Sequence, residues 1–161
     1  MECAANAGQS LEEAVERYSD LVYRLAFSQM RSKSEADDVY QEVFLRYFRK
    51  NPAFASEEHR KAWLIRVTLN CCRKQWSSPW RKRTVSLDDR EDFVFPEPEE
   101  TGLREQLLRL PAQYRAVLHL FYYEDLSVEE TARALGRKPA TVRTQLTRAR
   151  RLLKGYFEEN E

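Results

Sequence analysis

Apolar residues recur at three- and four-residue intervals along most of this chain, and that spacing is the strongest constraint on its fold. An α-helix brings residues at those intervals onto one side, where they can face a core. Glycine and proline are scarce, at 4 and 6 of 161 residues, and alternation of β-branched and polar residues is nearly absent. The sequence therefore predicts an all-α protein.

The first half of the chain predicts three helices. Their expected ranges are residues 11–30, 34–50 and 58–76. In the second helix, Ser34 is the expected N-cap, and Asp37 can close a weaker form of the capping box. Ser77, Ser78 and Pro79 then break the helical pattern.

The stretch that follows differs in charge. Residues 84–100 hold seven acidic side chains against Arg90 alone, together with two prolines. This composition predicts a solvated, flexible acidic linker over residues 77–100. It divides the chain into an N-terminal helical domain, residues 1–76, and a C-terminal helical domain, residues 101–161. The expected architecture is two small helical bundles joined by this linker.

A helix-turn-helix is expected in the second bundle. Ser127 and Glu130 have the spacing of a capping box, which starts a short helix over residues 128–135. Gly136 suits the left-handed turn that ends this helix, and Pro139 suits the first position of the next. A short helix, a glycine turn and a longer helix are typical of the DNA-binding helix-turn-helix.

The longer helix has two faces when its residues are placed at about 100° per residue. Val142, Leu146, Ala149 and Leu153 are expected to face the core. Hydroxyl and guanidinium groups on the other side can bond base edges and phosphates, so we expect it to contact duplex DNA. The candidate residues on this helix and the turn before it are Arg137, Lys138, Thr141, Arg143, Thr144, Thr147, Arg148 and Arg151. The alternative is a solvated cationic helix in a bundle.

The third helix carries a second candidate nucleic-acid surface. Residues 60–83 include eight basic side chains and no acid. On a helical wheel the core side is Leu64, Ile65, Thr68, Leu69, Cys72 and Trp76, and the opposite side is Trp63, Arg66, Asn70, Arg73 and Lys74. An exposed tryptophan can stack on an unpaired base, and an asparagine can bond a base edge held out of the stack. The alternative is that Trp63 packs on a neighbouring loop.

The outer face of the second helix suits a protein partner instead. It carries Asp38, Gln41, Glu42 and Leu45. Carboxylates repel phosphate, whereas a leucine framed by acids fits an apolar spot surrounded by basic residues. The alternative is an ordinary solvated face with one exposed leucine.

These segments, in this order, resemble bacterial sigma factors of the extracytoplasmic-function (ECF) group within the sigma-70 family. The stretches that carry the resemblance are SEADDVYQEVFLRYF, AWLIRVTLNCCRKQW and the run from LPAQYRAVLHLFYYEDLSVEE to RTQLTRARRLLK. The resemblance implies that the first domain binds core RNA polymerase and captures the −10 promoter element as a melted strand, while the C-terminal domain reads the −35 element as duplex.

Residue roles follow from the same resemblance. By position, Arg143, Thr144, Thr147 and Arg148 match the residues that read the −35 element. Asn70 matches the residue that lines the pocket for a flipped −10 base. Asp38, Gln41, Glu42 and Leu45 match the polymerase-facing surface. Family members are commonly held by an anti-sigma factor, so such a partner is also implied.

Two other classes of function, a stand-alone regulator and an enzyme, fit the sequence less well. A stand-alone helix-turn-helix regulator would not need the faces around Asn70 and Leu45. An enzyme is not favoured, because His59 and His119 are the only histidines and neither lies in a recognisable nucleophile or ligand motif. We therefore expect no cofactor and no metal, with Cys72 and His119 packed in the core. No apolar run could span a bilayer and no signal peptide is evident, so a cytoplasmic location is expected.

The linker suggests one further hypothesis. In the free protein its acidic residues could fold against the basic DNA-facing surfaces, in which case deleting Asp88–Glu100 would raise polymerase-free DNA binding.

Overall fold

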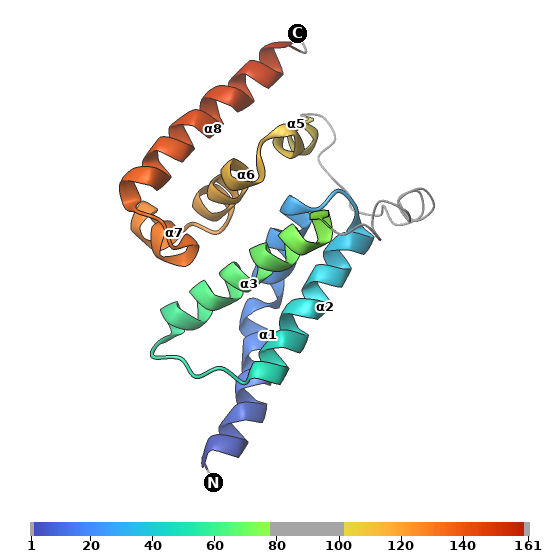
Figure 1. Cartoon of the computed structure of the whole chain (residues 1–161), viewed down its shortest axis with the longest axis vertical. Coiled ribbons are helices and arrows are strands. Elements are labelled where there is room, and N and C mark those ends of the chain that lie inside the picture. The colour runs from blue at the N-terminus through green and yellow to red at the C-terminus, as the bar shows by residue number, and fades with distance from the viewer. Residues whose placement is uncertain (1, 78–101, 160–161) are drawn as a thin grey trace.

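Helices make up nearly all of the computed structural model of the protein, which describes residues 2–77 and 102–159 (Figure 1). The helices are α1 (Glu2–Gln29), α2 (Lys33–Lys50), α3 (Glu57–Ser77), α5 (Leu103–Arg109), α6 (Ala112–Leu118), α7 (Val128–Leu135) and α8 (Pro139–Glu159), with a π-helical turn η1 (His119–Tyr123) after α6. No strand occurs in these ranges. The predicted all-α fold is confirmed.

Helices α1, α2 and α3 pack on one another around the apolar sides that their spacing predicts. Val22, Leu25, Val43, Tyr47 and Leu64 are fully or almost fully buried at the centre. Helix α2 ends at Asn51, whose left-handed backbone lets its N–H donate to the carbonyl of Tyr47. This bundle fixes the outer faces of α2 and α3.

The predicted N-cap of α2 is wrong. Helix α2 begins at Lys33, and Ser32 is its cap: the Ser32 hydroxyl accepts the Glu35 N–H and donates to the Glu35 carboxylate. Both Ser32 and Ser34 have an acid three residues later, but capping at the earlier serine lengthens the helix by two residues, about half a turn. Asp37 forms an ion pair with Lys33 instead, at 3.0 Å.

The C-terminal helices enclose a second core. Leu110, Val117, Val142, Leu146 and Ala149 are buried there. Helix α8, red in Figure 1, lies on the far side of this core from the first bundle and packs on α6 and α7. Its outer face is therefore directed away from the N-terminal helices.

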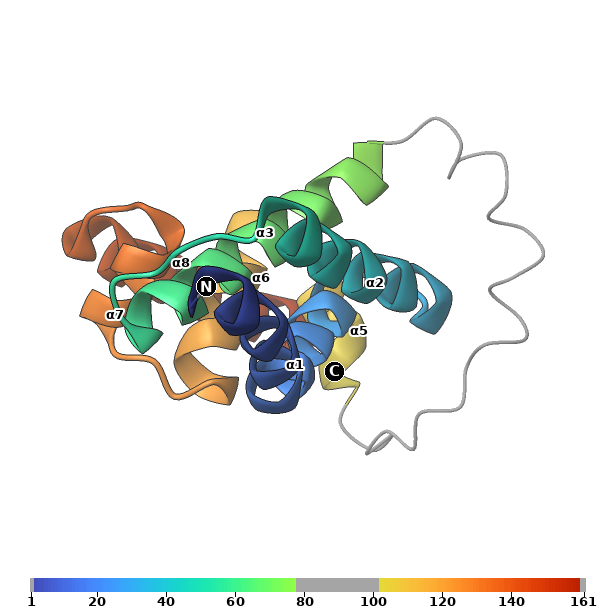
Figure 2. The same cartoon turned by 90° about the horizontal axis from the view of Figure 1, so that it is seen from below.

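The two bundles also pack against each other, as the two views in Figure 1 and Figure 2 show. Leu120, Leu126 and Ala134 from the C-terminal half are buried in the same apolar cluster as α1, α2 and α3. Arg104 of α5 donates to two carbonyls at the C-terminal end of α1, those of Phe27 and Met30, each at 2.8 Å. A guanidinium is favourable there because the last carbonyls of a helix lack partners within it.

The predicted linker lies outside the described residues except for Ser77, which is the last residue of α3. The hypothesis that its acids mask the DNA-facing surfaces therefore stays a prediction. Within the described ranges, no helix is both long and apolar enough to cross a membrane.

Candidate nucleic-acid interface

The helix-turn-helix has the local chemistry that the sequence predicts. The Ser127 hydroxyl accepts the Glu130 N–H, and the Glu130 carboxylate accepts the Ser127 N–H, both at 3.0 Å. Gly136 has the left-handed backbone of a C-cap, with φ 67° and ψ 38°, and Pro139 begins α8. These three local signals begin α7, end it and begin α8, as the motif requires.

The outer face of α8 is open. Every predicted duplex-contacting residue from position 138 onwards is exposed: Lys138, Thr141, Arg143, Thr144, Thr147, Arg148 and Arg151. The hydroxyls of Thr144 and Thr147 donate to carbonyls one turn earlier, which leaves their lone pairs outward as acceptors. Arg143 forms an exposed ion pair with Glu129 at 3.3 Å. Such a surface pair is weak, so this guanidinium can exchange it for DNA.

Arg137 differs from the rest of its predicted set. It is partly buried in the turn before α8 and donates to the Gln145 side chain at 2.8 Å. Burial lowers the pKa of Arg137, and the charge of Arg73 on α3 lowers it further. Arg137, predicted to contact −35 DNA, and Arg73, predicted to contact −10 DNA, thus lie close enough for their charges to interact.

The outer side of α3 keeps four of its five predicted residues exposed: Arg66, Asn70, Arg73 and Lys74. The expected exposure of Trp63 is wrong. Its ring is partly buried and packs edge-on against Tyr47 and against Phe54 of the α2–α3 loop, at centroid distances of 5.6 and 5.9 Å. Aromatic rings gain by this edge-to-face packing. The alternative interpretation, packing on a neighbouring loop, is confirmed for Trp63.

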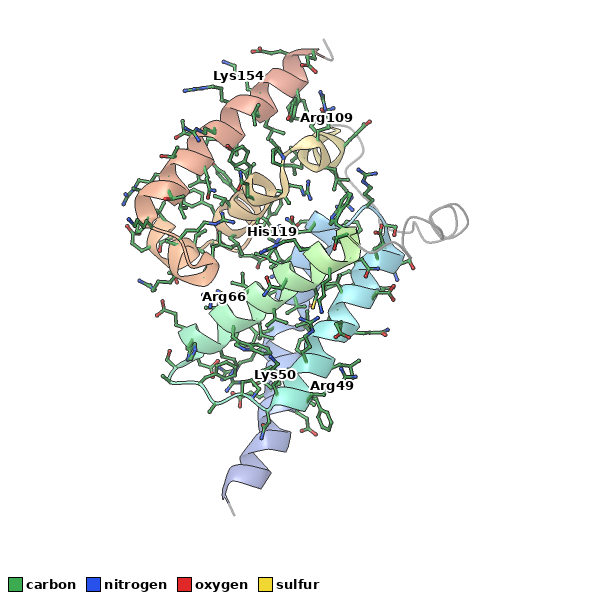
Figure 3. The ribbon with its side chains drawn as sticks, in the orientation of Figure 1. Arg49, Lys50, Arg66, Arg109, His119 and Lys154 are labelled. Atoms are coloured by element: carbon green, nitrogen blue, oxygen red, sulfur yellow. The ribbon has the colours of Figure 1, made fainter. Side chains whose placement is uncertain are left out.

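Helix α7 lies against α3 and uses part of that same outer side, near the label of Arg66 in Figure 3. The Arg66 guanidinium donates to the carbonyls of Arg133 and Ala134 at the C-terminal end of α7, at 3.2 and 3.4 Å. A second contact between the two helices is the ion pair of Arg133 on α7 with Glu58 on α3, at 2.6 Å. The candidate strand-binding helix α3 is therefore bound by α7, the first helix of the helix-turn-helix.

A partly buried ion pair also joins the bundles. The side chain of Glu124 is only 3% exposed. Its carboxylate accepts two hydrogen bonds from the Arg24 guanidinium of α1, at 2.8 and 3.1 Å. The same carboxylate lies 2.8 Å from Nε2 of His119. Burial alone would raise the pKa of Glu124, but the bonds from His119 and Arg24 outweigh it and lower this pKa to about 2. His119, labelled in Figure 3, is buried as predicted. Its link to Arg24, via Glu124, was not predicted.

The outer face of α2 is more apolar than the sequence suggests. Leu45 is 45% exposed, and Phe48, one turn further on, is 67% exposed. Asp38 and Gln41 are exposed, and Glu42 pairs with Arg46 at 3.1 Å. Phe48 was missed by the sequence analysis, although the spacing of Gln41, Leu45 and Phe48 places all three on one side of a helix.

The cysteines of α3 have no nucleophilic character. Cys71 and Cys72 are both buried and free. Burial, followed by the neighbouring Cys71, raises the pKa of Cys72 to about 12, and burial also raises that of Cys71. Because the thiolate is the reactive form, both thiols stay protonated at neutral pH.

Comparisons with known proteins give the class of protein that this architecture belongs to. The family models for sigma-70 region 2 and for sigma-70, region 4, match residues 14–82 and 101–153. The chain belongs to the sigma-70 family. Within that family it is a sigma factor of the ECF group, the group that several of its relatives carry in their names.

Three relatives illustrate the match. The sigma factor SigV of Bacillus subtilis is 32% identical over 82% of this chain and 81% of its own length. The ECF sigma factor SigE of Mycolicibacterium smegmatis is 32% identical over 94% of this chain, which spans only 63% of that longer relative. The ECF sigma factor SigW of Bacillus subtilis is 27% identical over 91% of this chain and 88% of its own length.

Solved structures give the same fold. CnrH, solved in complex with the cytosolic domain of CnrY, superposes with a TM-score of 0.72 at 21% identity, over 99% of this chain and 96% of that one. RpoE of Bartonella quintana, solved with the anti-sigma factor NepR, gives a TM-score of 0.68 at 21% identity, over 95% of this chain and 99% of that one.

Proposed function

We propose that this sigma factor directs promoter-specific transcription initiation through three surfaces, one each on α2, α3 and α8. One observation carries the proposal: both sigma-70 regions match this chain in their order, and the three predicted faces lie on the outer sides of these helices. A stand-alone helix-turn-helix regulator would need only the face on α8.

The face on α2 binds core RNA polymerase. Leu45 and Phe48 supply an exposed apolar centre, and Asp38, Gln41 and Glu42 supply the polar and acidic surroundings. An apolar centre with a charged rim is the usual arrangement of a protein interface, and the acids select a basic partner. Residues 1–76 form the domain that carries this face.

The face on α3, in the same domain, captures the melted −10 strand. Asn70 is exposed in the middle of the helix, and its amide can both donate to and accept from a base edge. Arg73 and Lys74, also exposed, hold the backbone phosphates. Trp63, being partly buried, offers at most one edge of its ring. Arg66 must leave the carbonyls of α7 before it can bind phosphate.

The face on α8 reads the −35 element as duplex. Its arginines can each bond a guanine with two hydrogen bonds, and its threonine hydroxyls can accept from base amino groups in the major groove. Residues 101–161 form the domain that carries it, and residues 77–100 join the two domains. This chain performs no reaction itself, because the polymerase supplies the chemistry, and it acts in the cytoplasm with the polymerase.

An anti-sigma factor is the expected inhibitory partner. The support is that two proteins of the same fold were solved with such a partner or with a cytosolic protein domain bound.

Run-off transcription with core polymerase and a promoter library tests the function. We expect promoter-dependent transcripts that require this chain, and stable binding to core polymerase. The absence of both would overturn the proposal, and DNA binding without core binding would favour the stand-alone regulator.

Replacing Asn70 by alanine tests the −10 assignment. We expect promoter opening to fall by about tenfold or more, since losing one base-edge contact costs about 1–3 kcal/mol, while closed-complex binding changes little. Permanganate reactivity reports opening, and a gel-shift assay reports the closed complex. Gln75→Ala, another amide on α3, is the control. Equal losses of opening and closed-complex binding would contradict the role of Asn70.

A further inference from the structure

A pocket of about 560 Å³ lies where the two bundles meet, between the second half of α3, the end of α5 and α6. Four arginines from four parts of the chain line it, and we call them the pocket arginines: Arg31, Arg73, Arg115 and Arg137. No aspartate or glutamate is among the lining residues that the structure describes. Four cations with no acid among the described lining residues are unusual in a partly enclosed site, because each repels the others.

Arg115 is the most deeply placed of the four, with only 6% of the residue exposed. Its Nη1 donates to the carbonyls of Leu108 and Leu110, at 3.3 and 2.6 Å. Its Nε is buried and has no hydrogen-bond partner among the described residues. A buried donor on a charged group without a partner is costly, so the surroundings of Arg115 leave its positive charge incompletely satisfied.

The other pocket arginines have no carboxylate partner in the described part of the chain. Arg31 stacks over Trp76, with its guanidinium carbon 4.5 Å from the ring centroid. The Arg137 guanidinium donates to the side-chain oxygen of Gln145, which is uncharged. Burial lowers the pKa of Arg115; the neighbouring Cys72 opposes this, and the charges of Arg31 and Arg104 add smaller lowering effects. Burial and the charge of Arg73 lower the pKa of Arg137.

The size and walls of the pocket narrow the choice of anion. Its volume is in the range of small-molecule sites, about 300–1,000 Å³. A single carboxylate could neutralise one arginine only, whereas a chain of phosphate groups presents several charges and oxygens in many directions to guanidinium forks. Two amides, Gln29 and Gln113, and an apolar wall that includes Leu69 and Leu110 complete the lining.

We propose that this pocket binds a small phosphate-rich anion, a nucleoside triphosphate or an inorganic oligophosphate, whose phosphates are held by the pocket arginines. Such a ligand would bridge α3 to the turn before α8, because Arg73 belongs to the first and Arg137 to the second. It would therefore stabilise the packed arrangement of the two bundles. If the proposed function holds, the ligand also withdraws Arg73 and Arg137 from promoter DNA, and so lowers DNA binding.

Isothermal titration of the full chain with inorganic tripolyphosphate and, separately, with ATP tests the site at about 0.15 M ionic strength. We expect saturable 1:1 binding. Arg31→Gln removes a charge from the pocket, and Gln113→Glu adds an acid at its exposed edge without removing a packed group. Each should weaken binding by about tenfold or more, since bonds to charged groups are worth about 1.5–3 kcal/mol.

Arg49→Gln is the matched control, because Arg49 is an exposed arginine that does not line the pocket and lies at the far end of α2 (Figure 3). Circular dichroism melting checks that each variant folds. Tighter binding of ATP than of tripolyphosphate would assign the apolar wall to the base, and equal binding would assign the site to phosphate alone; both support the proposal.

Three results would overturn it: no saturable binding at millimolar ligand, equal weakening by Arg49→Gln and Arg31→Gln, or single-stranded DNA binding that depends on Arg31 and Gln113 while tripolyphosphate does not bind. The titration contains neither polymerase nor promoter, so its failure leaves the proposed function standing.

Discussion

The two predicted DNA-contacting surfaces differ in what the rest of the protein does with them. On α8 the candidate residues from Lys138 onwards are exposed, and α8 lies apart from the N-terminal bundle. On α3, Arg66 is bonded to the end of α7 and Arg73 lines the pocket between the bundles. The −35 face can therefore meet DNA in this arrangement, whereas the −10 face must first give up contacts within the protein.

Under the proposed function, this difference would order the events at a promoter. Duplex binding by α8 needs no rearrangement of the bundles, but strand capture by α3 competes with α7 for Arg66. A ligand can shift an equilibrium only by binding one form better than the other. A melted strand satisfies that condition because it uses α3, which the C-terminal bundle partly covers, so we expect it to favour separation of the bundles.

The largest expected effect is on the open face. Replacing Arg143 and Arg148 together by alanine should weaken −35 duplex binding by about a hundredfold, since each arginine contributes about 1–3 kcal/mol. Binding of single-stranded −10 DNA should stay the same. Fluorescence anisotropy with the two oligonucleotides measures both affinities, and Lys154→Ala, an exposed cation further along α8, is the control. A parallel loss of single-strand binding would mean that the two faces do not act separately.

The contact between the bundles gives the next effect. Glu124→Ala leaves the buried His119 without its partner and removes both bonds to Arg24, which costs about 1–3 kcal/mol. Single-stranded −10 DNA should then bind about tenfold more tightly to the free protein, because α3 is uncovered more often. Amide hydrogen exchange along α7 should rise with it.

Glu105→Ala, which removes an exposed glutamate from α5, is the control for that experiment. Unchanged exchange and affinity in Glu124→Ala would show that the packing of the bundles does not limit access to α3.

A smaller effect of the same contact should appear on acidification. The pKa of Glu124 is about 2, below the ordinary 4.5, so the stability that its carboxylate contributes is complete above about pH 4.5 and is lost as pH falls towards 2. The protonated carboxyl keeps its shape and one hydrogen bond, so less is lost than in Glu124→Ala. Urea unfolding of the protein and of Glu124→Gln between pH 7 and pH 3 measures it. Glu124→Gln should lack this part of the pH dependence of the unfolding free energy. Identical pH dependence in the two proteins would contradict the stabilising role of the Glu124 carboxylate.

The local structure and exposure of the α8 face followed the prediction more closely than the surroundings of the α3 face, for a physical reason. Ser127, Gly136 and Pro139 act through bonds within a few residues of themselves, so their spacing carries the signal. The cap of α2 shows the limit of that approach, because Ser32 and Ser34 both fit the pattern and only the length of the helix decides between them.

The features that cover α3 join residues far apart in the chain. Arg66 bonds a residue 67 positions away, and Arg24 bonds one 100 positions away. Periodicity within a helix cannot indicate which distant element will pack there. The predicted exposure of Trp63 was wrong for a related reason. Its position on the helical wheel is correct, but Phe54 of the preceding loop packs against its ring. Phe48 was within reach of sequence reasoning, through its spacing from Leu45.

The smallest expected effect is on the exposed ion pair that accompanies Arg66. Glu58 and Arg133 are each more than half exposed, so their 2.6 Å contact is screened by water and salt. Glu58→Gln should therefore raise single-stranded DNA binding by less than about threefold, within the roughly 0–1 kcal/mol of a surface pair. The effect should vanish in high salt, whereas that of Glu124→Ala should persist because Glu124 is buried. An effect of Glu58→Gln as large as that of Glu124→Ala would place the main contact between the bundles at α7 and α3 instead of at α1 and Glu124.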